Sequence, residues 1–200
     1  MAFLEVNQVK KSFGQGDTRV EVLRGIDLTV EKGKLCVLLG PSGSGKSTLL
    51  NIIGGIDGPD SGSVAIAKEK IEDMNEKKLS LYRRKHLGYV FQQYNLIANL
   101  TVKENIEVGA YLSDAPLDVD ELLPDVLLCD EPTGALDYKT SKEILELIEQ
   151  VNSKYQNTII IVTHNDAIKH MADQVVSLRD GQIRSQVYND HKIPAMQLEW

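Results

Sequence analysis

The stretch Gly40-Pro41-Ser42-Gly43-Ser44-Gly45-Lys46-Ser47-Thr48 follows directly on the apolar run Leu35-Cys36-Val37-Leu38-Leu39. It fills the pattern G-x-x-x-x-G-K-[ST], in which a buried strand leads into a glycine-rich loop and then into a helix. The next residues, Leu49-Leu50-Asn51-Ile52-Ile53, have the apolar character of such a helix. This order predicts an α/β fold of the P-loop NTPase type, with a site for a nucleoside triphosphate.

The residue types of this loop suit the binding of phosphate. Glycines allow a tight turn and let backbone N–H groups approach phosphate oxygens, and the following helix N-terminus adds partial positive charge. Lys46 is expected to reach the β and γ phosphates, and the Ser47 hydroxyl is expected to bind Mg²⁺. We therefore predict that the triphosphate is bound by Gly40, Pro41, Ser42, Gly43, Ser44, Gly45, Lys46, Ser47 and Thr48.

Composition limits the class of protein. The chain has 200 residues, of which 42% are hydrophobic and 26% charged, which is typical of one ordinary globular domain. A net charge of -7 argues against non-specific binding of nucleic acid. No apolar run is long enough to cross a membrane, and the first residues lack the features of a signal peptide. We therefore expect a cytoplasmic protein that reaches a membrane only through a protein partner.

The distribution of apolar residues predicts the architecture. Residues 3–13 and 20–31 read as antiparallel strands, whereas the apolar strands further on alternate with helices, which predicts a mostly parallel sheet covered on both faces. Residues 175–187 read as a hairpin. Cys36 and Cys129 lie inside apolar runs and are expected to be buried thiols, not disulfide or metal ligands.

Three helices are also expected. Residues 142–154 have an apolar face at helical spacing. Residues 74–86 read as an exposed amphipathic helix, and the basic residues at its end, Arg83-Arg84-Lys85-His86, are interpreted as a solvated face. Residues 101–112 form the third candidate.

Acidic and basic side chains follow two of the apolar strands. Asp130 and Glu131 come directly after residues 126–129, and His164 ends the run of residues 158–163. Because the carboxyl ends of parallel strands meet at one edge of a sheet, these groups are expected beside the phosphate loop. Asp130 is predicted to hold Mg²⁺, Glu131 to orient or deprotonate an attacking water, and His164 to contact the γ phosphate.

Two further residues are ambiguous when they are read alone. Gln92 has an amide oxygen suited to Mg²⁺, but it is equivalent to its neighbour Gln93 and is interpreted by default as a polar loop residue. Phe13 is interpreted by default as a core aromatic, although an exposed ring would be able to stack on a nucleobase.

The motifs together resemble the nucleotide-binding subunit of an ATP-binding cassette (ABC) transporter. The matching segments, in order, are the phosphate loop, Gln92 after Tyr89-Val90-Phe91, Leu127 to Pro132, Gly134-Ala135-Leu136-Asp137 and Thr163-His164. Residues 51–57, 82–84, 91–96 and 131–137 are most similar to the branch that serves lipoprotein release, macrolide export and antimicrobial-peptide resistance.

The resemblance implies functions for individual residues. Phe13 would stack on adenine, Gln92 would link Mg²⁺ to the permease contact, and Asp137 would act across a dimer. Glu131 and His164, with Lys46, would support hydrolysis of ATP. The implied protein is a homodimer on ATP binding, peripheral at the inner face of the cell membrane through a permease, and it does not bind nucleic acid.

One family motif is missing. The family has a Leu-Ser-Gly-Gly-Gln signature before the strand that ends in Asp130, and this string does not occur here. The helical subdomain, expected over residues 80–123, is therefore incomplete, with a seam near residues 123–124. Three explanations remain open: the printed sequence lacks residues that the protein has, the protein carries a deletion, or it is a degenerate form that does not hydrolyse ATP.

Three functions are compatible with these observations. The favoured one is an ATP-hydrolysing subunit that energises a membrane transporter of the export or peptide-resistance type. The alternative is a nucleotide-dependent regulatory or binding module without efficient hydrolysis, which the missing signature favours. An ATPase of DNA repair shares the motifs but is disfavoured by the acidic charge.

Overall fold

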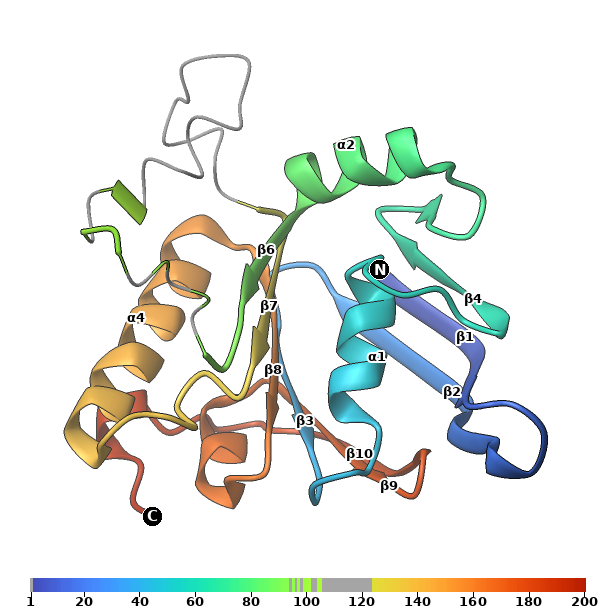
Figure 1. Cartoon of the computed structure of the whole chain (residues 1–200). Coiled ribbons are helices and arrows are strands. Elements are labelled where there is room, and N and C mark those ends of the chain that lie inside the picture. Colours follow the sequence, from blue (N-terminus) through green and yellow to red (C-terminus); the bar gives the residue numbers. More distant parts are fainter. Residues whose placement is uncertain (1, 94, 96, 98, 102–103, 106–123) are drawn as a thin grey trace.

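The computed structural model (Figure 1) describes residues 2–93, 95, 97, 99–101, 104–105 and 124–200. Its strands are β1 (Ala2–Phe13), β2 (Val20–Glu31), β3 (Leu35–Leu39), β4 (Ser61–Ile66), β5 (Glu69–Lys70), β6 (Leu87–Val90), β7 (Val126–Asp130), β8 (Thr158–Thr163), β9 (Gln174–Arg179) and β10 (Gln182–Tyr188). Its helices are α1 (Lys46–Ile53), α2 (Glu76–His86) and α4 (Tyr138–Tyr155), and its 3-10 turns are η1 (Gly16–Thr18), η2 (Asp166–Met171) and η3 (Ala195–Gln197).

A central six-stranded sheet has the strand order β10-β9-β3-β8-β7-β6. The strands from β9 to β6 pair in parallel, and β10 returns antiparallel to β9 as the expected hairpin. Parallel strands of one sheet end at the same edge, so the loops that follow β3, β7 and β8 lie close to one another. The predicted class, an α/β P-loop core with a mostly parallel sheet, is confirmed.

A second, antiparallel sheet has the strand order β2-β1-β4-β5. It contains the two long strands predicted at the start of the chain, and β4 pairs with β1. Helix α1 lies between this sheet and the central one (Figure 1). The antiparallel subdomain was therefore correctly predicted, and it forms one wall of the space that α1 occupies.

The central sheet is buried on both faces, which explains its continuous apolar strands. Along β8 the side chains alternate, since Ile160 and Val162 belong to the core around α1, whereas Ile159 and Ile161 belong to the core beneath α4. Cys36 and Cys129 are free and fully buried, as expected, and burial raises the pKa of each thiol to about 12.

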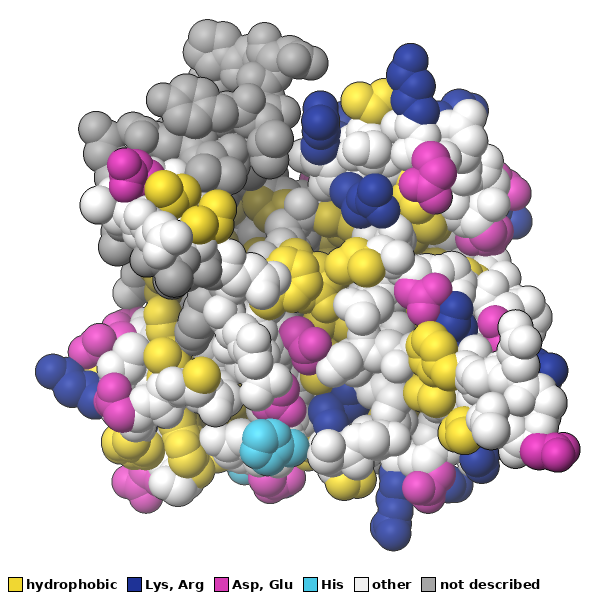
Figure 2. Space-filling view, in the orientation of Figure 1, with side chains coloured by type: hydrophobic (Ala, Val, Ile, Leu, Met, Phe, Trp, Pro, Cys, Tyr) yellow, Lys and Arg dark blue, Asp and Glu magenta, His cyan; other side chains and the backbone are white. Residues whose placement is uncertain are grey.

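The end of α2 differs from its prediction as a solvated face. Lys and Arg side chains do gather over α2 on the surface (Figure 2), where Arg84 and Lys85 are exposed. Arg83, however, donates a 2.7 Å hydrogen bond to the Gly55 carbonyl, and the buried His86 lies 2.6 Å from a carboxylate oxygen of Asp125. Half of this basic cluster is therefore structural.

About half of the expected helical subdomain, residues 80–123, lies outside the described residues, as does most of the helix predicted at residues 101–112. The seam predicted near residues 123–124 falls at the border of the described part. Among the described helices, none combines the length and the apolar character that crossing a bilayer requires.

Helix α4 offers a matched test of the core. Leu145 of this helix is completely buried, whereas Leu147, two residues further on, is 54% exposed. We expect Leu145→Ala to lower the free energy of unfolding by about 2 to 5 kcal/mol, because it leaves a cavity in the core. Leu147→Ala is expected to change it by less than about 1 kcal/mol.

Urea denaturation followed by circular dichroism measures both values. Equal losses in the two variants would contradict the packing of α4 described here.

Candidate functional site

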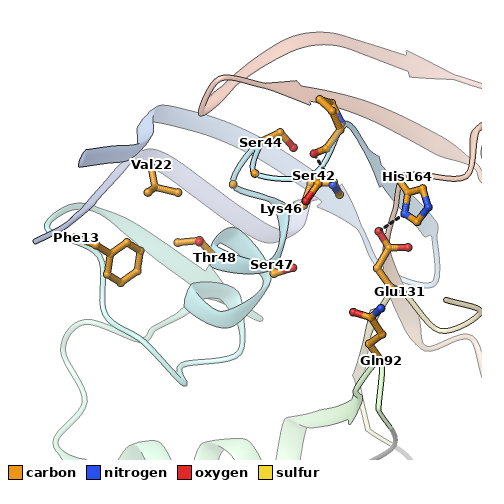
Figure 3. Close-up of a pocket in the computed structure, with 13 residues that line it drawn as sticks. Phe13, Val22, Ser42, Ser44, Lys46, Ser47, Thr48, Gln92, Glu131 and His164 are labelled. Carbon is orange, nitrogen blue, oxygen red and sulfur yellow. Dashed lines mark hydrogen bonds and ion pairs between the residues drawn. The ribbon is translucent and has the colours of Figure 1, made fainter. Parts of the chain in front are cut away.

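A cleft of about 730 Å³ opens at the edge of the central sheet where β3, β7 and β8 end. The phosphate loop, the carboxylate after β7 and the histidine after β8 all contribute to it, as Figure 3 shows. The cleft is lined by Phe13, Val22, Pro41, Ser42, Gly43, Ser44, Gly45, Lys46, Ser47, Thr48, Gln92, Glu131 and His164.

Lys46 begins α1 and is only 6% exposed. Its ammonium donates hydrogen bonds to the carbonyl oxygens of Gly40 at 2.7 Å and Pro41 at 2.9 Å. Burial lowers the pKa of Lys46, while the nearby Glu131 and Asp130 act in the opposite direction. The loop thus wraps around a largely buried cation, which is able to exchange these carbonyls for phosphate oxygens.

Two glycines of the loop are required by close packing. A Cβ on Gly40 would lie 2.1 Å from the Leu178 carbonyl oxygen, and one on Gly45 (φ +99°) would lie 2.8 Å from Leu23. The hairpin loop between β9 and β10 supports the same region, since the Gly181 amide donates to the Ser44 carbonyl at 3.2 Å. The conformation of the loop is therefore set by both sheets.

Other features of the loop fit a bound polyphosphate. A Cβ on Gly43 would meet only open space, and its φ of +76° disfavours other residues. The Ser44 hydroxyl is buried and has no hydrogen-bond partner among the described residues. Helix α1 has no side-chain cap at its N-terminus, so its first N–H groups are available to an anion.

Glu131 adopts a left-handed backbone conformation, with φ +48°. Its amide donates to the Val162 carbonyl, which ties β7 to β8 and directs the carboxylate toward the end of β8. There the Thr163 hydroxyl donates to Oε2 at 3.2 Å, and His164 Nδ1 lies 2.9 Å from Oε1. Figure 3 draws Glu131 and His164, joined by a dashed line, beside the phosphate loop.

Asp130 accepts a 3.0 Å hydrogen bond from the Ser47 hydroxyl. Burial raises the pKa of Asp130, and the bond from Ser47 partly offsets this shift. A hydroxyl and a carboxylate side by side next to a phosphate loop suit Mg²⁺, which takes one or two protein ligands and completes its shell with water and substrate phosphates.

Gln92 and Phe13 lie at opposite sides of the cleft. Gln92 points in beside Glu131, and its amide is close to Gly134, whereas Gln93 does not line the cleft. The default interpretation of Phe13 as a core aromatic is wrong, since its ring is 47% exposed at the mouth of the cleft. Both residues are therefore available to a ligand.

Asp137 lies outside the lining of this cleft. Its carboxylate caps α4 by accepting from the amide and the hydroxyl of Thr140, and these bonds lower its pKa. Val22, by contrast, was not anticipated as a lining residue. It reaches the cleft because β2 passes beside the phosphate loop, and a single valine in a strand carries no sequence signal of such a position.

Comparison with known proteins agrees with this geometry. The profile of the ABC transporter family matches residues 23–177. A "Putative ABC transporter ATP-binding protein MG065 homolog" from Mycoplasma pneumoniae is 37% identical over 98% of this chain and 50% of its own length, so this chain spans about half of that relative. The alignment covers 233 residues, more than this chain has, so the relative contains residues without a counterpart here.

Two shorter relatives are covered almost completely. The lipoprotein-releasing system ATP-binding protein LolD of Geobacter metallireducens is 37% identical over 91% of this chain and 98% of its own length. The bacitracin export ATP-binding protein BceA of Halalkalibacterium halodurans is 36% identical, with coverages of 94% and 89%. Macrolide export proteins named MacB also match. The predicted branch of the family is thereby confirmed.

A solved structure has the same fold. The dimeric post-hydrolysis state of the ATP-binding cassette MJ0796, bound to ADP and Pi, superposes with a TM-score of 0.83 at 28% identity, covering 92% of this chain and 98% of that one. The sequence profile, the relatives and the fold lead to one conclusion: this chain belongs to the ABC transporter family.

Proposed function

We propose that this chain binds and hydrolyses ATP with Mg²⁺ and thereby energises a membrane transporter of the export or peptide-resistance type. The observation that carries the proposal is the cleft in which a glycine-rich phosphate loop faces the paired Glu131 and His164 side chains. The relatives named for lipoprotein release, bacitracin export and macrolide export support this type of transporter over a regulatory module.

The phosphate loop would hold the triphosphate before any chemistry takes place. Its N–H groups and the Ser44 hydroxyl are proposed to donate to phosphate oxygens, and Lys46 would turn from its two carbonyls toward the β and γ phosphates. The exposed ring of Phe13 is proposed to stack on the adenine at the mouth of the cleft. Substrate would thus span the cleft from Phe13 to Glu131.

Ser47, Asp130 and Gln92 are proposed to hold Mg²⁺. When bound, this ion neutralises charge on the phosphates during transfer. The Asp130 carboxylate already accepts from the Ser47 hydroxyl at 3.0 Å, so the two oxygens are close enough to act on one ion. Gln92 would join them from the segment that follows β6.

Glu131 is proposed as the residue that orients the attacking water and accepts its proton. Thr163 and His164 each contact one of its carboxylate oxygens, which fixes the plane of the carboxylate. His164 is 68% exposed at its side chain, whereas Glu131 is only 14% exposed, so the imidazole forms the outer edge of the pair. His164 would contact the γ phosphate and so respond to its hydrolysis.

A second copy of the chain is proposed to complete the site. The cleft is open to solvent, and the related cassette MJ0796 is dimeric in two solved structures, which supports this proposal. Asp137 is proposed to act across this dimer, and a membrane permease is the proposed partner, which would place the chain at the inner face of the cell membrane. Nucleic acid is not a proposed partner.

A nucleotide-dependent regulatory module remains the second candidate because the Leu-Ser-Gly-Gly-Gln signature does not occur in the sequence. Such a module would bind ATP without closing a productive dimer. Sedimentation at saturating Mg-ATP separates the two functions, because the transporter subunit should dimerise and the module should remain a monomer.

Lys46 provides a test of nucleotide binding. We expect Lys46→Ala to weaken ATP binding about 10- to 100-fold, because it removes charge-assisted hydrogen bonds to the phosphates. Equilibrium dialysis with labelled ATP measures the dissociation constant. Lys85→Ala, an exposed change of the same kind in α2, is the control and should bind as the wild type does. Equal affinities of the two variants would contradict the assigned binding site.

Glu131 provides a test of hydrolysis. We expect Glu131→Gln to retain ATP binding and to lower the turnover number at least about 100-fold, because the amide cannot accept a proton from water. Phosphate release by the full chain, together with its membrane partner, measures turnover.

Glu143→Gln is the control, since Glu143 is an exposed residue of α4. Undiminished turnover in Glu131→Gln would refute the proposed role of Glu131. A wild-type chain that binds ATP but never releases phosphate would favour the regulatory module.

A further inference from the structure

A second cleft, of about 490 Å³, lies on the other side of the Glu131 and His164 pair. Glu131 and His164 form part of its wall, and Trp200 forms another part. Gly134 and Leu136, from the loop that connects Glu131 to α4, and Tyr138, the first residue of α4, also line this cleft. Trp200 is thus near the proposed catalytic carboxylate although 69 residues (200 − 131) separate them in the sequence.

Residues 189–200 are named here the strap. They pack together with α4 and η2 on one face of the central sheet. Ala195 and Leu198 are almost fully buried in the core that α4 covers. In Figure 1 the red segment that ends at the label C runs beside α4. The strap is therefore an integral part of this core.

The strap is bonded first to the segment that follows His164. The Asn189 side-chain amide donates to the carbonyls of Lys169 and Ala172, both at 2.9 Å, and the Ile193 amide donates to the His170 carbonyl at 2.8 Å. These acceptors lie in or directly after η2, which begins two residues after His164. The strap thus fixes the segment in which His164 is anchored.

The strap is bonded next to α4, the helix that follows Glu131. The Ala195 amide donates to Glu149, and Lys142 Nζ donates to the Met196 carbonyl at 3.1 Å. At the start of α4, the Tyr138 hydroxyl donates to the Leu198 carbonyl at 3.4 Å, and its ring meets the indole of Trp200 edge-on at 5.0 Å. The strap therefore joins the two segments from which the catalytic pair projects.

The loop before α4 transmits this contact to Glu131. The Gly134 amide donates to the Glu131 carbonyl at 2.9 Å, and Asp137 caps the helix whose first residue is Tyr138. The indole of Trp200 thus contacts the residue that directly follows the loop supporting Glu131. Edge-to-face aromatic pairs of this kind contribute beyond their buried area.

We propose that the strap fixes Glu131 relative to His164 and that Trp200 is a positioning residue for hydrolysis. This role rests on the proposed function of the chain as an ATPase. Trp200 does not line the cleft of the phosphate loop, so it acts on turnover and not on ATP binding.

Replacement of Trp200 tests this role. Trp200→Ala is expected to lower kcat about tenfold and to leave the dissociation constant of ATP within about twofold of the wild-type value. Trp200→Phe restores most of the rate, because it keeps an aromatic ring against Tyr138. Met196→Ala is the control, since Met196 belongs to the same strap, is 48% exposed and contacts α4 through its backbone.

Hydrogen exchange gives a second readout that does not require hydrolysis. In the nucleotide-free full chain, the amides of residues 133–138 are expected to exchange about tenfold faster in Trp200→Ala than in Met196→Ala or the wild type. The proposal is overturned if this exchange is unchanged, or if Trp200→Ala turns over ATP as fast as an active wild type. An inactive wild type refutes the proposed function instead, and the exchange rates still decide the role of the strap.

Discussion

The parallel pairing of β3 with β8 and of β8 with β7 is the constraint on which the rest of this structure depends. The registers Leu39 with Thr163 and Asp130 with Val162 place the three strand ends next to one another. The strand ends therefore bring the phosphate loop close to His164 and to Asp130 and Glu131. A shift of one residue in either pairing would turn these side chains to the other face of the sheet.

Burial determines the electrostatics of the site. Lys46 is nearly inaccessible and its pKa is lowered, whereas the pKa of Asp130 is raised, so each group loses stabilisation of its charged form by water. Phosphates and Mg²⁺ would supply the missing opposite charges. The site is thus prepared for a ligand whose charge complements its own, and the fixed backbone of the loop reduces the reorganisation that binding requires.

Much of the fold was predictable from the sequence, because the phosphate loop and the apolar strands are local signals. The strand ends at Asp130 and His164 were placed correctly for the same reason. The resemblance implied a place for Phe13 at the nucleotide, although its residue type alone did not. Val22 and the His86 contact with Asp125 were not predictable, since each depends on which distant segments pack together. For the strap, Ile193-Pro194 and Trp200 indicate only a tail packed on the domain or on a partner. Its contacts with α4 and η2 arise only in the folded chain and were not predictable.

The central claim is that the edge of the parallel sheet forms one preorganised ATP site in each chain. Isothermal titration calorimetry of the wild-type chain with ATP and Mg²⁺ tests it most directly. The account predicts saturable binding with a stoichiometry of one ATP per chain and weaker binding when Mg²⁺ is removed by a chelator. Absence of saturable heat at millimolar ATP from a folded chain would contradict it.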